Sequence, residues 1–223
     1  ICEAKREMLE KYMECGLYPY SRYYLQNIKD VQGEYFKNHF NTIGLNGMNE
    51  ACLNLLGEDI TTEEGREFSV EIMDFMNKVI GIFQEETGSL WNLEASPAEG
   101  AAYRFARIDK RMYPSIITSG DKEPYYTNST QLPVGHTKDI FEALELQEPL
   151  QTRYTGGTVL HGFIGEEIED AETVKSLLKK AFENSEIPYI TITPTYSICS
   201  EHGYLKGEQT TCPECGKTTE VWT

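Results

Sequence analysis

The stretch that decides the fold runs from residue 158 to residue 194 and reads TVLHGFIGEEIEDAETVKSLLKKAFENSEIPYITITP. Residues 158–165 predict a short strand, and the β-branched run from 189 to 198 predicts another. Between them, Asp170 is placed to cap a helix that extends to about Asn184. Two strands separated by a helix of about 10 to 15 residues are typical of parallel strand pairing. We therefore expect an α/β protein.

Upstream of this stretch the sequence predicts mostly helices. Gly16 and Pro19 are stop signals after the first of them. The longest helix begins at a potential capping box in residues 61–64, repeats apolar side chains at intervals of three and four, and ends at Gly88. The other elements expected are a strand at 89–95 and helices at 1–14, 48–56, 98–112 and 137–147.

Length and charge limit the classes of function. The 223 residues allow one domain and a small appended element. Acidic residues outnumber basic ones by 36 to 20, which gives a net charge of −16, and no basic cluster stands out. There is no signal peptide and no apolar run of about 20 residues. We expect a cytoplasmic protein that binds neither nucleic acid nor membrane.

Four residues near the end of the chain have the spacing of zinc ligands: Cys199, His202, Cys212 and Cys215. They form two pairs, each with two residues between its members, so that both pairs can bind the same tetrahedral ion. Four protein ligands leave no open position, which predicts a structural zinc site. The alternatives are unliganded cysteines in a tail, or a weaker site in which a neighbouring glutamate or water replaces His202.

A second candidate site lies where the expected helix at 98–112 begins. Ser96 and Pro97 stand at the expected cap and first-turn positions, and small residues follow them. Unpaired amides at an uncrowded helix start are suited to a phosphate, although the carboxylate of Glu99 would oppose an anion. Ordinary helix capping explains the same pattern. The candidate phosphate-binding residues are Ser96, Pro97, Ala98, Glu99, Gly100, Ala101 and Ala102.

The remaining thiols and imidazoles give weaker signals. Cys52 lies on an apolar helical face and is expected in the core. Cys2 and Cys15 have no adjacent histidine or lysine pattern of the kind that makes a thiol reactive. The histidines at positions 39, 136 and 161 are isolated from any carboxylate or serine partner in the sequence.

Four long blocks, in this order, resemble a known family. They are HFNTIGLNGMNEACLNLLG, FQEETGSLWNLEASPAEGAAYRFARID, YYTNSTQLPVGHTKDIFEALELQEPLQTRYTGGTVLHGFIGE and IPYITITPTYSICSEHGYLKGEQTTCPECG. Together they are similar to the C-terminal half of the class III, anaerobic ribonucleoside-triphosphate reductases. The resemblance covers essentially the whole chain.

The resemblance implies a fold and a reaction. The fold is a ten-stranded glycyl-radical-type α/β barrel, of which residues 1–195 would form part of one half, with a zinc ribbon at 196–223. The reaction is the reduction of ribonucleoside triphosphates to deoxyribonucleotides for DNA synthesis, with formate or a thiol protein as reductant. A glycyl radical, made by an S-adenosylmethionine iron–sulfur activating enzyme, would pass to a cysteine on a finger loop. The whole enzyme would be an oxygen-sensitive homodimer.

The resemblance also bears on the site residues. The loop at 96–102 matches the place where related reductases hold substrate phosphate. The cysteine-rich ribbon matches the four expected zinc ligands, with His202 where many members have a second cysteine.

No residue of this chain matches the finger-loop cysteine, and the sequence stops at TEVWT, where the radical glycine segment would begin. We therefore expect no catalytic residue here and no activity from the chain alone. Two other hypotheses remain open. One is a noncatalytic zinc-ribbon interaction module on an α/β platform, and the other is an unrelated phosphate-handling enzyme.

Overall fold

The computed structural model describes residues 1–120, 122–133, 135–137, 139–164 and 170–222, and it is an α/β structure. The helices in these residues are α1 (Cys2–Glu14), α2 (Pro19–Gln32), α3 (Met48–Leu55), α4 (Glu63–Thr87), α5 (Glu99–Met112), α6 (Ile140–Gln151) and α7 (Ala171–Asn184). The strands are β1 (Phe40–Leu45), β2 (Leu90–Ala95), β3 (Leu160–Ile164), β4 (Ile190–Pro194), β5 (Tyr196–Cys199), β6 (Gly203–Lys206) and β7 (Glu220–Trp222).

The strand–helix–strand unit predicted from residues 158–194 is confirmed. Strands β3 and β4 pair in parallel, with Leu160 opposite Ile190, and α7 connects them. Asp170 caps α7 by accepting hydrogen bonds from the amides of Glu172 and Thr173, at 3.2 and 3.1 Å. Gly165, the last residue of the expected strand, lies outside the described residues.

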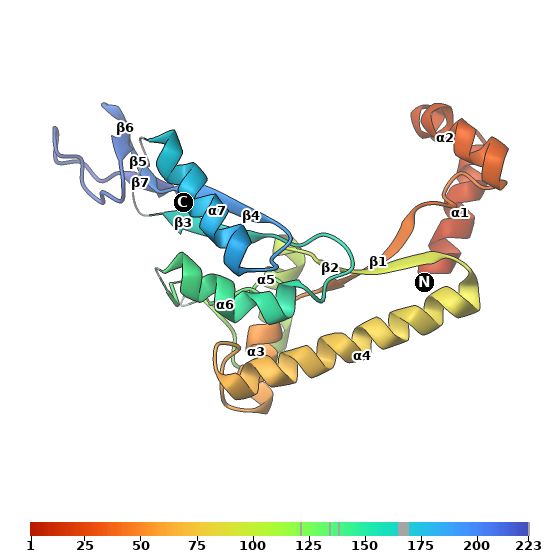
Figure 1. Cartoon of the computed structure of the whole chain (residues 1–223), viewed down its shortest axis with the longest axis horizontal. Coiled ribbons are helices and arrows are strands. Elements are labelled where there is room, and N and C mark those ends of the chain that lie inside the picture. The colour runs from red at the N-terminus through yellow and green to blue at the C-terminus, as the bar shows by residue number, and fades with distance from the viewer. Residues whose placement is uncertain (121, 134, 138, 165–169, 223) are drawn as a thin grey trace.

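A second parallel pair is formed by β1 and β2, which lie side by side from Phe40 and Leu90 to Leu45 and Ala95. The long helix α4 covers one face of this pair, as Figure 1 shows. Its N-cap is Thr62, whose hydroxyl accepts a hydrogen bond from the Gly65 amide at 3.1 Å. The core between α3, α4 and the strands contains these buried side chains: Met48, Cys52, Ile60, Met73, Ile80, Leu93, Leu150 and Tyr154.

Helix α6 packs against both parallel pairs. Its first half, with Ile140 and Leu144, contributes to the core beneath β3 and β4, which also contains Ala181 of α7. Its last turn places Leu150 in the core beneath β1 and β2. The two sheets are therefore joined by one helix, which begins later and ends later than the 137–147 expected; Lys138 lies outside the described residues.

The strand expected at 189–198 is two strands in different sheets. Residues up to Pro194 belong to β4, and residues from Tyr196 belong to β5, which pairs with β6 and β7 in an antiparallel sheet. The amide of Thr195, between them, donates to the carbonyl of Ile164 at 2.8 Å, which extends the contact with β3 one residue beyond the end of β4. A continuous β-branched run does not reveal that its hydrogen-bond partners change along its length.

Two elements in the first 45 residues were not predicted. Pro19 is not only a stop signal, because it occupies the first turn of α2, where a missing amide costs nothing. Strand β1 lies in a segment with few β-branched residues and is formed because β2 lies beside it. In Figure 1, α1 and α2 lie at one end of the molecule and the three-stranded sheet lies at the other.

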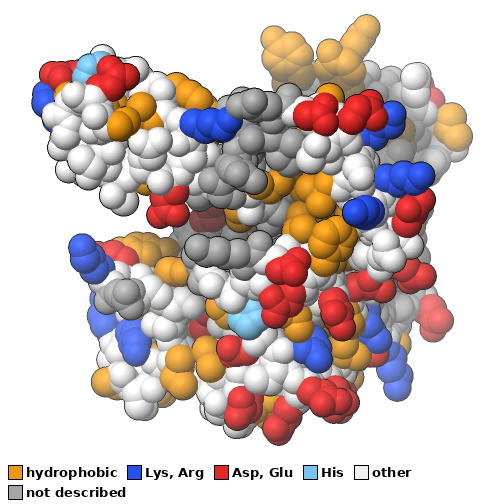
Figure 2. All heavy atoms as spheres, turned by 60° about the vertical axis from the view of Figure 1, so that its left-hand side comes forward, with side chains coloured by type: hydrophobic (Ala, Val, Ile, Leu, Met, Phe, Trp, Pro, Cys, Tyr) orange, Lys and Arg blue, Asp and Glu red, His pale blue; other side chains and the backbone are white. Residues whose placement is uncertain are grey.

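The surface agrees with the charge composition. On the face shown in Figure 2, acidic side chains are spread over much of the surface, with lysine and arginine side chains scattered between them. Across the described residues, no helix combines the length and the apolar character that a bilayer crossing requires. The described strands form two separate parallel pairs and one antiparallel sheet, so the expected ten-stranded barrel is not confirmed by this chain.

Candidate functional site

The expected zinc ligands come together in the three-stranded sheet and the loop after it. Cys199 is the last residue of β5, and His202 lies in the turn that leads to β6. The second pair lies in a knuckle in which the Cys212 amide donates to the carbonyl of Lys217 and the Gly216 amide donates to the carbonyl of Cys212, at 2.8 and 2.9 Å. Gly216 has a φ of 69°, which a residue with a side chain rarely adopts.

The separations fit a single tetrahedral ion. With Zn–S bonds of about 2.3 Å and Zn–N bonds of about 2.0 Å, ligand atoms lie about 3.5 to 3.8 Å apart. The Cys199 Sγ lies 3.6 Å from the Cys215 Sγ and 3.7 Å from the His202 Nδ1. The Cys212 Sγ lies 3.4 Å from the same Nδ1. All four ligand atoms are within 4.8 Å of one another, so these residues can hold a zinc ion.

Neighbouring groups favour the ligating form of Cys199. Backbone amides of Glu201 and His202 donate to the Cys199 sulfur and lower the pKa of this thiol to about 6. The other imidazole nitrogen, His202 Nε2, lies 3.6 Å from a carboxylate oxygen of Glu214. This places the carboxylate on the side of the ring away from the thiols, as is usual for metal-bound histidine.

The candidate phosphate loop has the expected helix after it but a different cap. Helix α5 begins at Glu99, and its N-cap is Ala98, which has a left-handed backbone with φ of 45° and makes no side-chain capping bond. The prediction that Ser96 and Pro97 occupy the cap and first turn is therefore wrong. They lie before the helix because the Asn46 amide group binds the carbonyl of Pro97 at 2.9 Å and holds this segment against the end of β1.

The first turn of α5 contains backbone amides that are not used in hydrogen bonds within the described part of the chain. The amides of Ala101 and Ala102 both donate to the Ala98 carbonyl, at 2.8 Å. For the amides of Glu99 and Gly100 there is no acceptor among the described residues. A Cβ atom added to Gly100 would have no heavy atom within 4 Å, so this side of the helix start is open. Free amides at an open helix start can bind an anion.

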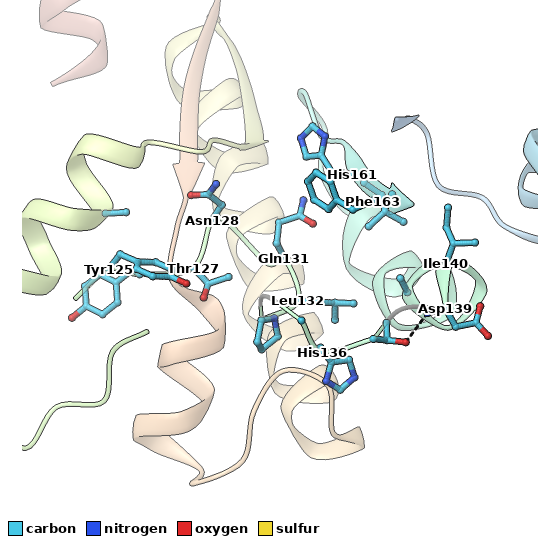
Figure 3. Close-up of a pocket in the computed structure, with 18 of the residues that line it drawn as sticks. Tyr125, Thr127, Asn128, Gln131, Leu132, His136, Asp139, Ile140, His161 and Phe163 are labelled. Carbon is cyan, nitrogen blue, oxygen red and sulfur yellow. Dashed lines mark hydrogen bonds between the residues drawn. The ribbon is translucent and has the colours of Figure 1, made fainter. Parts of the chain in front are cut away.

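A cavity of about 530 Å³ adjoins this helix start. Glu99 and Ala102 of α5 line one side of it. In Figure 3 the segment between α5 and α6 contributes Thr127, Asn128 and Gln131, and β3 contributes the residues on the other side. The cavity combines apolar walls with a few polar groups, as small-molecule sites do.

Two histidines that look isolated in the sequence lie in this cavity. His136 and His161 both line it, although 25 positions separate them. The Nδ1 of His161 lies 2.8 Å from the Thr191 hydroxyl, and its ring lies 6.2 Å from that of Phe163, centre to centre. Sequence spacing could not reveal this grouping, because it depends on how β3 packs beside residues 125–133 and 135–137.

The expectation that Cys52 is a core residue is confirmed. Its side chain is fully buried, and its sulfur lies 3.4 Å from the Ser69 hydroxyl. Burial raises the pKa of this thiol, so it is held in the neutral form.

Fold and site together define an α/β protein with a cysteine–histidine metal cluster and a cavity at a helix start. The family described as anaerobic ribonucleoside-triphosphate reductase matches residues 1–223, and the chain belongs to this family. The anaerobic ribonucleoside-triphosphate reductase of Escherichia coli K12 is 25% identical over 199 residues, which are 85% of this chain and 28% of that protein. The chain thus spans little more than a quarter of the length of this relative.

Solved structures agree with the family. A structure of an anaerobic ribonucleotide reductase superposes with a TM-score of 0.70 at 25% identity and covers 98% of this chain and 33% of that one. The anaerobic ribonucleotide reductase from Thermotoga maritima, in complex with dATP and CTP, superposes with a TM-score of 0.68 at 25% identity and covers 98% of this chain and 34% of that one.

Proposed function

We propose that this chain forms part of an enzyme that reduces ribonucleoside triphosphates to deoxyribonucleoside triphosphates for DNA synthesis in the cytoplasm. The observation that carries the proposal is the likeness in shape to anaerobic ribonucleotide reductase over 98% of the chain. In the whole protein, residues 1–195 would supply part of a ten-stranded barrel and residues 196–223 the zinc ribbon.

The role proposed for residues 96–102 is to bind substrate phosphate. The support is the pair of unpartnered amides at Glu99 and Gly100, together with the cavity next to them. The net charge of −16 provides no long-range attraction for an anion, so local amide dipoles must supply it. Because Glu99 lines the cavity and its carboxylate repels an anion, we place the phosphates at the edge of the cavity beside Gly100, where the surface is open.

The role proposed for Cys199, His202, Cys212 and Cys215 is to hold one structural zinc ion. Four protein ligands whose donor atoms lie within 4.8 Å of one another would complete a tetrahedral ion and leave no position for substrate or water. The ion would stabilise a small sheet whose own buried apolar cluster consists of little more than Leu205 and the ligand cysteines.

The radical chemistry is proposed to depend on the complete protein. A glycyl radical, generated by an S-adenosylmethionine iron–sulfur activating enzyme, would supply the hydrogen-atom abstraction that acid–base groups cannot perform. We propose that this protein acts as an oxygen-sensitive homodimer, with formate or a thiol protein as reductant.

The 223-residue chain alone is proposed to be inactive. Its thiols outside the metal cluster are Cys2, Cys15 and Cys52. Cys52 is enclosed in the core, and the other two lie on or beside α1, away from the cavity at α5.

Two measurements test the proposed function. Calorimetry of the purified chain with CTP should give saturable binding, and a chain that binds zinc but no CTP would instead favour the noncatalytic zinc-ribbon module.

Anaerobic incubation with the activating enzyme, S-adenosylmethionine, a reductant and CTP should yield dCTP from the product of the complete gene. The same incubation of the chain alone should yield neither dCTP nor a glycyl signal in electron paramagnetic resonance, and either product would contradict its proposed inactivity.

A further inference from the structure

We propose that Ser129 and Glu50 are positioning residues for the phosphate loop, and that they fix the backbone of residues 96–98 without touching the nucleotide. The inference rests on the proposed function of that loop. It concerns two side chains that come from other parts of the chain and that the sequence pattern does not connect with phosphate binding.

The first observation is a pair of unusual backbone conformations. Among the described residues that are not glycine, Ala98 and Ser129 have positive φ, at 45° and 49°. Such conformations are unfavourable for residues with a Cβ atom and persist where neighbouring contacts determine them. The two segments are in direct contact, because the Ser129 hydroxyl donates to the carbonyl of Ser96 at 3.1 Å.

The second observation is that Ser129 is itself firmly held. Its side chain is 2% exposed. Its carbonyl accepts a hydrogen bond from the Met48 amide at 3.1 Å, and the carbonyl of Thr127 accepts one from the Gly47 amide at 2.9 Å. The start of α3 therefore binds the 127–129 segment through backbone donors that would otherwise lack partners.

The third observation is the carboxylate of Glu50, which is 1% exposed. It accepts hydrogen bonds from the Thr127 amide at 2.9 Å and from the Thr127 hydroxyl at 2.6 Å. The hydroxyl of Ser119 donates to it as well, at 2.6 Å. A carboxylate buried among neutral donors fixes their positions, because each donor would be left unsatisfied if it moved away.

These contacts form one chain of support. Glu50 accepts hydrogen bonds from Thr127, and Ser129 lies two residues further along the same segment. The Ser129 hydroxyl in turn donates to the carbonyl of Ser96, just before α5. Thr127 and Asn128 also line the cavity that adjoins the helix start. Phosphate binding by backbone amides requires a fixed loop shape, since the donors cannot adjust as side chains do. The support therefore fixes the relative position of the loop and the cavity wall.

The experiment compares Ser129→Gly with the wild-type chain. Glycine adopts a positive φ without steric cost, so this variant removes the hydroxyl but keeps the backbone conformation accessible. Ser176→Ala is the control, because Ser176 is an exposed serine of α7. Amide hydrogen exchange would follow residues 96–102, and calorimetry would give the affinities for CTP and for cytidine.

We expect Ser129→Gly to exchange faster at residues 98–102 and to bind CTP about tenfold more weakly, while its affinity for cytidine stays unchanged. Unchanged exchange at these residues would overturn the positioning role, whatever the affinities. An equal loss of affinity for CTP and cytidine would also overturn it, because it would indicate a general structural role. If Ser129→Gly exchanges faster but the wild-type chain does not bind CTP, the proposed phosphate-binding role of residues 96–102 is wrong. Ser129 would then fix the shape of a loop that does not bind phosphate.

Discussion

The Nδ1 atom of His202 lies 3.4 Å from the sulfur of Cys212, so the imidazole directs Nδ1 and not Nε2 toward the thiols. Nε2 is left to face Glu214. A histidine held in this way can replace a cysteine in a four-ligand site without opening a coordination position.

The first prediction is that the purified chain contains one zinc ion, and that Cys212→Ser loses most of it. Removal of a buried ligand leaves three, and structural zinc contributes about 10 kcal/mol or more to the folding of small ribbons. Elemental analysis measures the zinc, and thermal unfolding measures the stability. Full zinc content with an unchanged melting curve would refute the site, while Cys15→Ser, at an exposed thiol, serves as the control.

The second prediction concerns Gly100. A leucine here would project into the open space at the start of α5, where phosphate is proposed to bind, without meeting another heavy atom of the chain at its Cβ. We expect Gly100→Leu to weaken CTP binding at least tenfold and to leave zinc content unchanged. Gly81→Leu is the matched control, because Gly81 is also helical and also has open space at its Cβ position. Equal affinity of both variants for CTP would count against the loop.

The third prediction concerns the stability contributed by Glu50. In Glu50→Gln, the amide nitrogen would face one of the donors on Thr127 or Ser119 and leave it without an acceptor. We expect the free energy of unfolding to fall by about 2 to 3 kcal/mol. Urea unfolding measures it, and Glu67→Gln, at an exposed position of α4, should change it by less than about 0.5 kcal/mol. A loss at Glu50 no larger than at Glu67 would show that the buried contacts are not required.

The fourth prediction is a loss of stability at alkaline pH that depends on Tyr154. Burial raises the pKa of its phenol from 10.0 to about 12. The pKa of the phenol is higher in the folded state than in the unfolded state. Burial of the neutral phenol therefore contributes stability that is fully present below pH 10 and is lost as the pH rises toward 12. Tyr154→Phe cannot ionise, although it lacks the contact at 3.1 Å with the Thr130 hydroxyl at every pH.

Urea unfolding between pH 9 and pH 11.5 would test this. The stability of the wild-type chain should fall toward that of Tyr154→Phe by at most about 1.4 kcal/mol per pH unit. Stability curves that remain parallel across this range would contradict the prediction.

The parts of the fold that depend on local signals could be predicted from the sequence. The β3–α7–β4 unit has a capping aspartate, Asp170, between two β-branched runs, and all of its signals lie within 37 residues. The metal cluster is equally local, since Cys199 and Cys215 are only 16 positions apart. Short-range patterns of this kind are sufficient because the contacts they predict form between near neighbours in the chain.

The rest depends on contacts between distant segments. The cavity brings Glu99 beside residues of β3 that lie more than 60 positions away, and no periodicity in the sequence records this. The sequence does not predict helix α2, because Pro19 is interpreted as the stop signal of the preceding helix. In the structure the same proline occupies the first turn of α2. The buried carboxylate of Glu50 gives no signal either, because an acidic residue in a first helical turn usually faces solvent.

A single residue, Thr195, separates the parallel strand β4 from the antiparallel strand β5. One residue spans at most about 3.6 Å and has only two soft torsions, so it cannot act as a flexible linker. Thr195 is also buried and donates its amide to the carbonyl of Ile164, so the ribbon is attached to β4 through a held residue and moves with it. A fluorophore attached to the ribbon would consequently report the tumbling of the whole chain, and its anisotropy would fall when the ribbon unfolds.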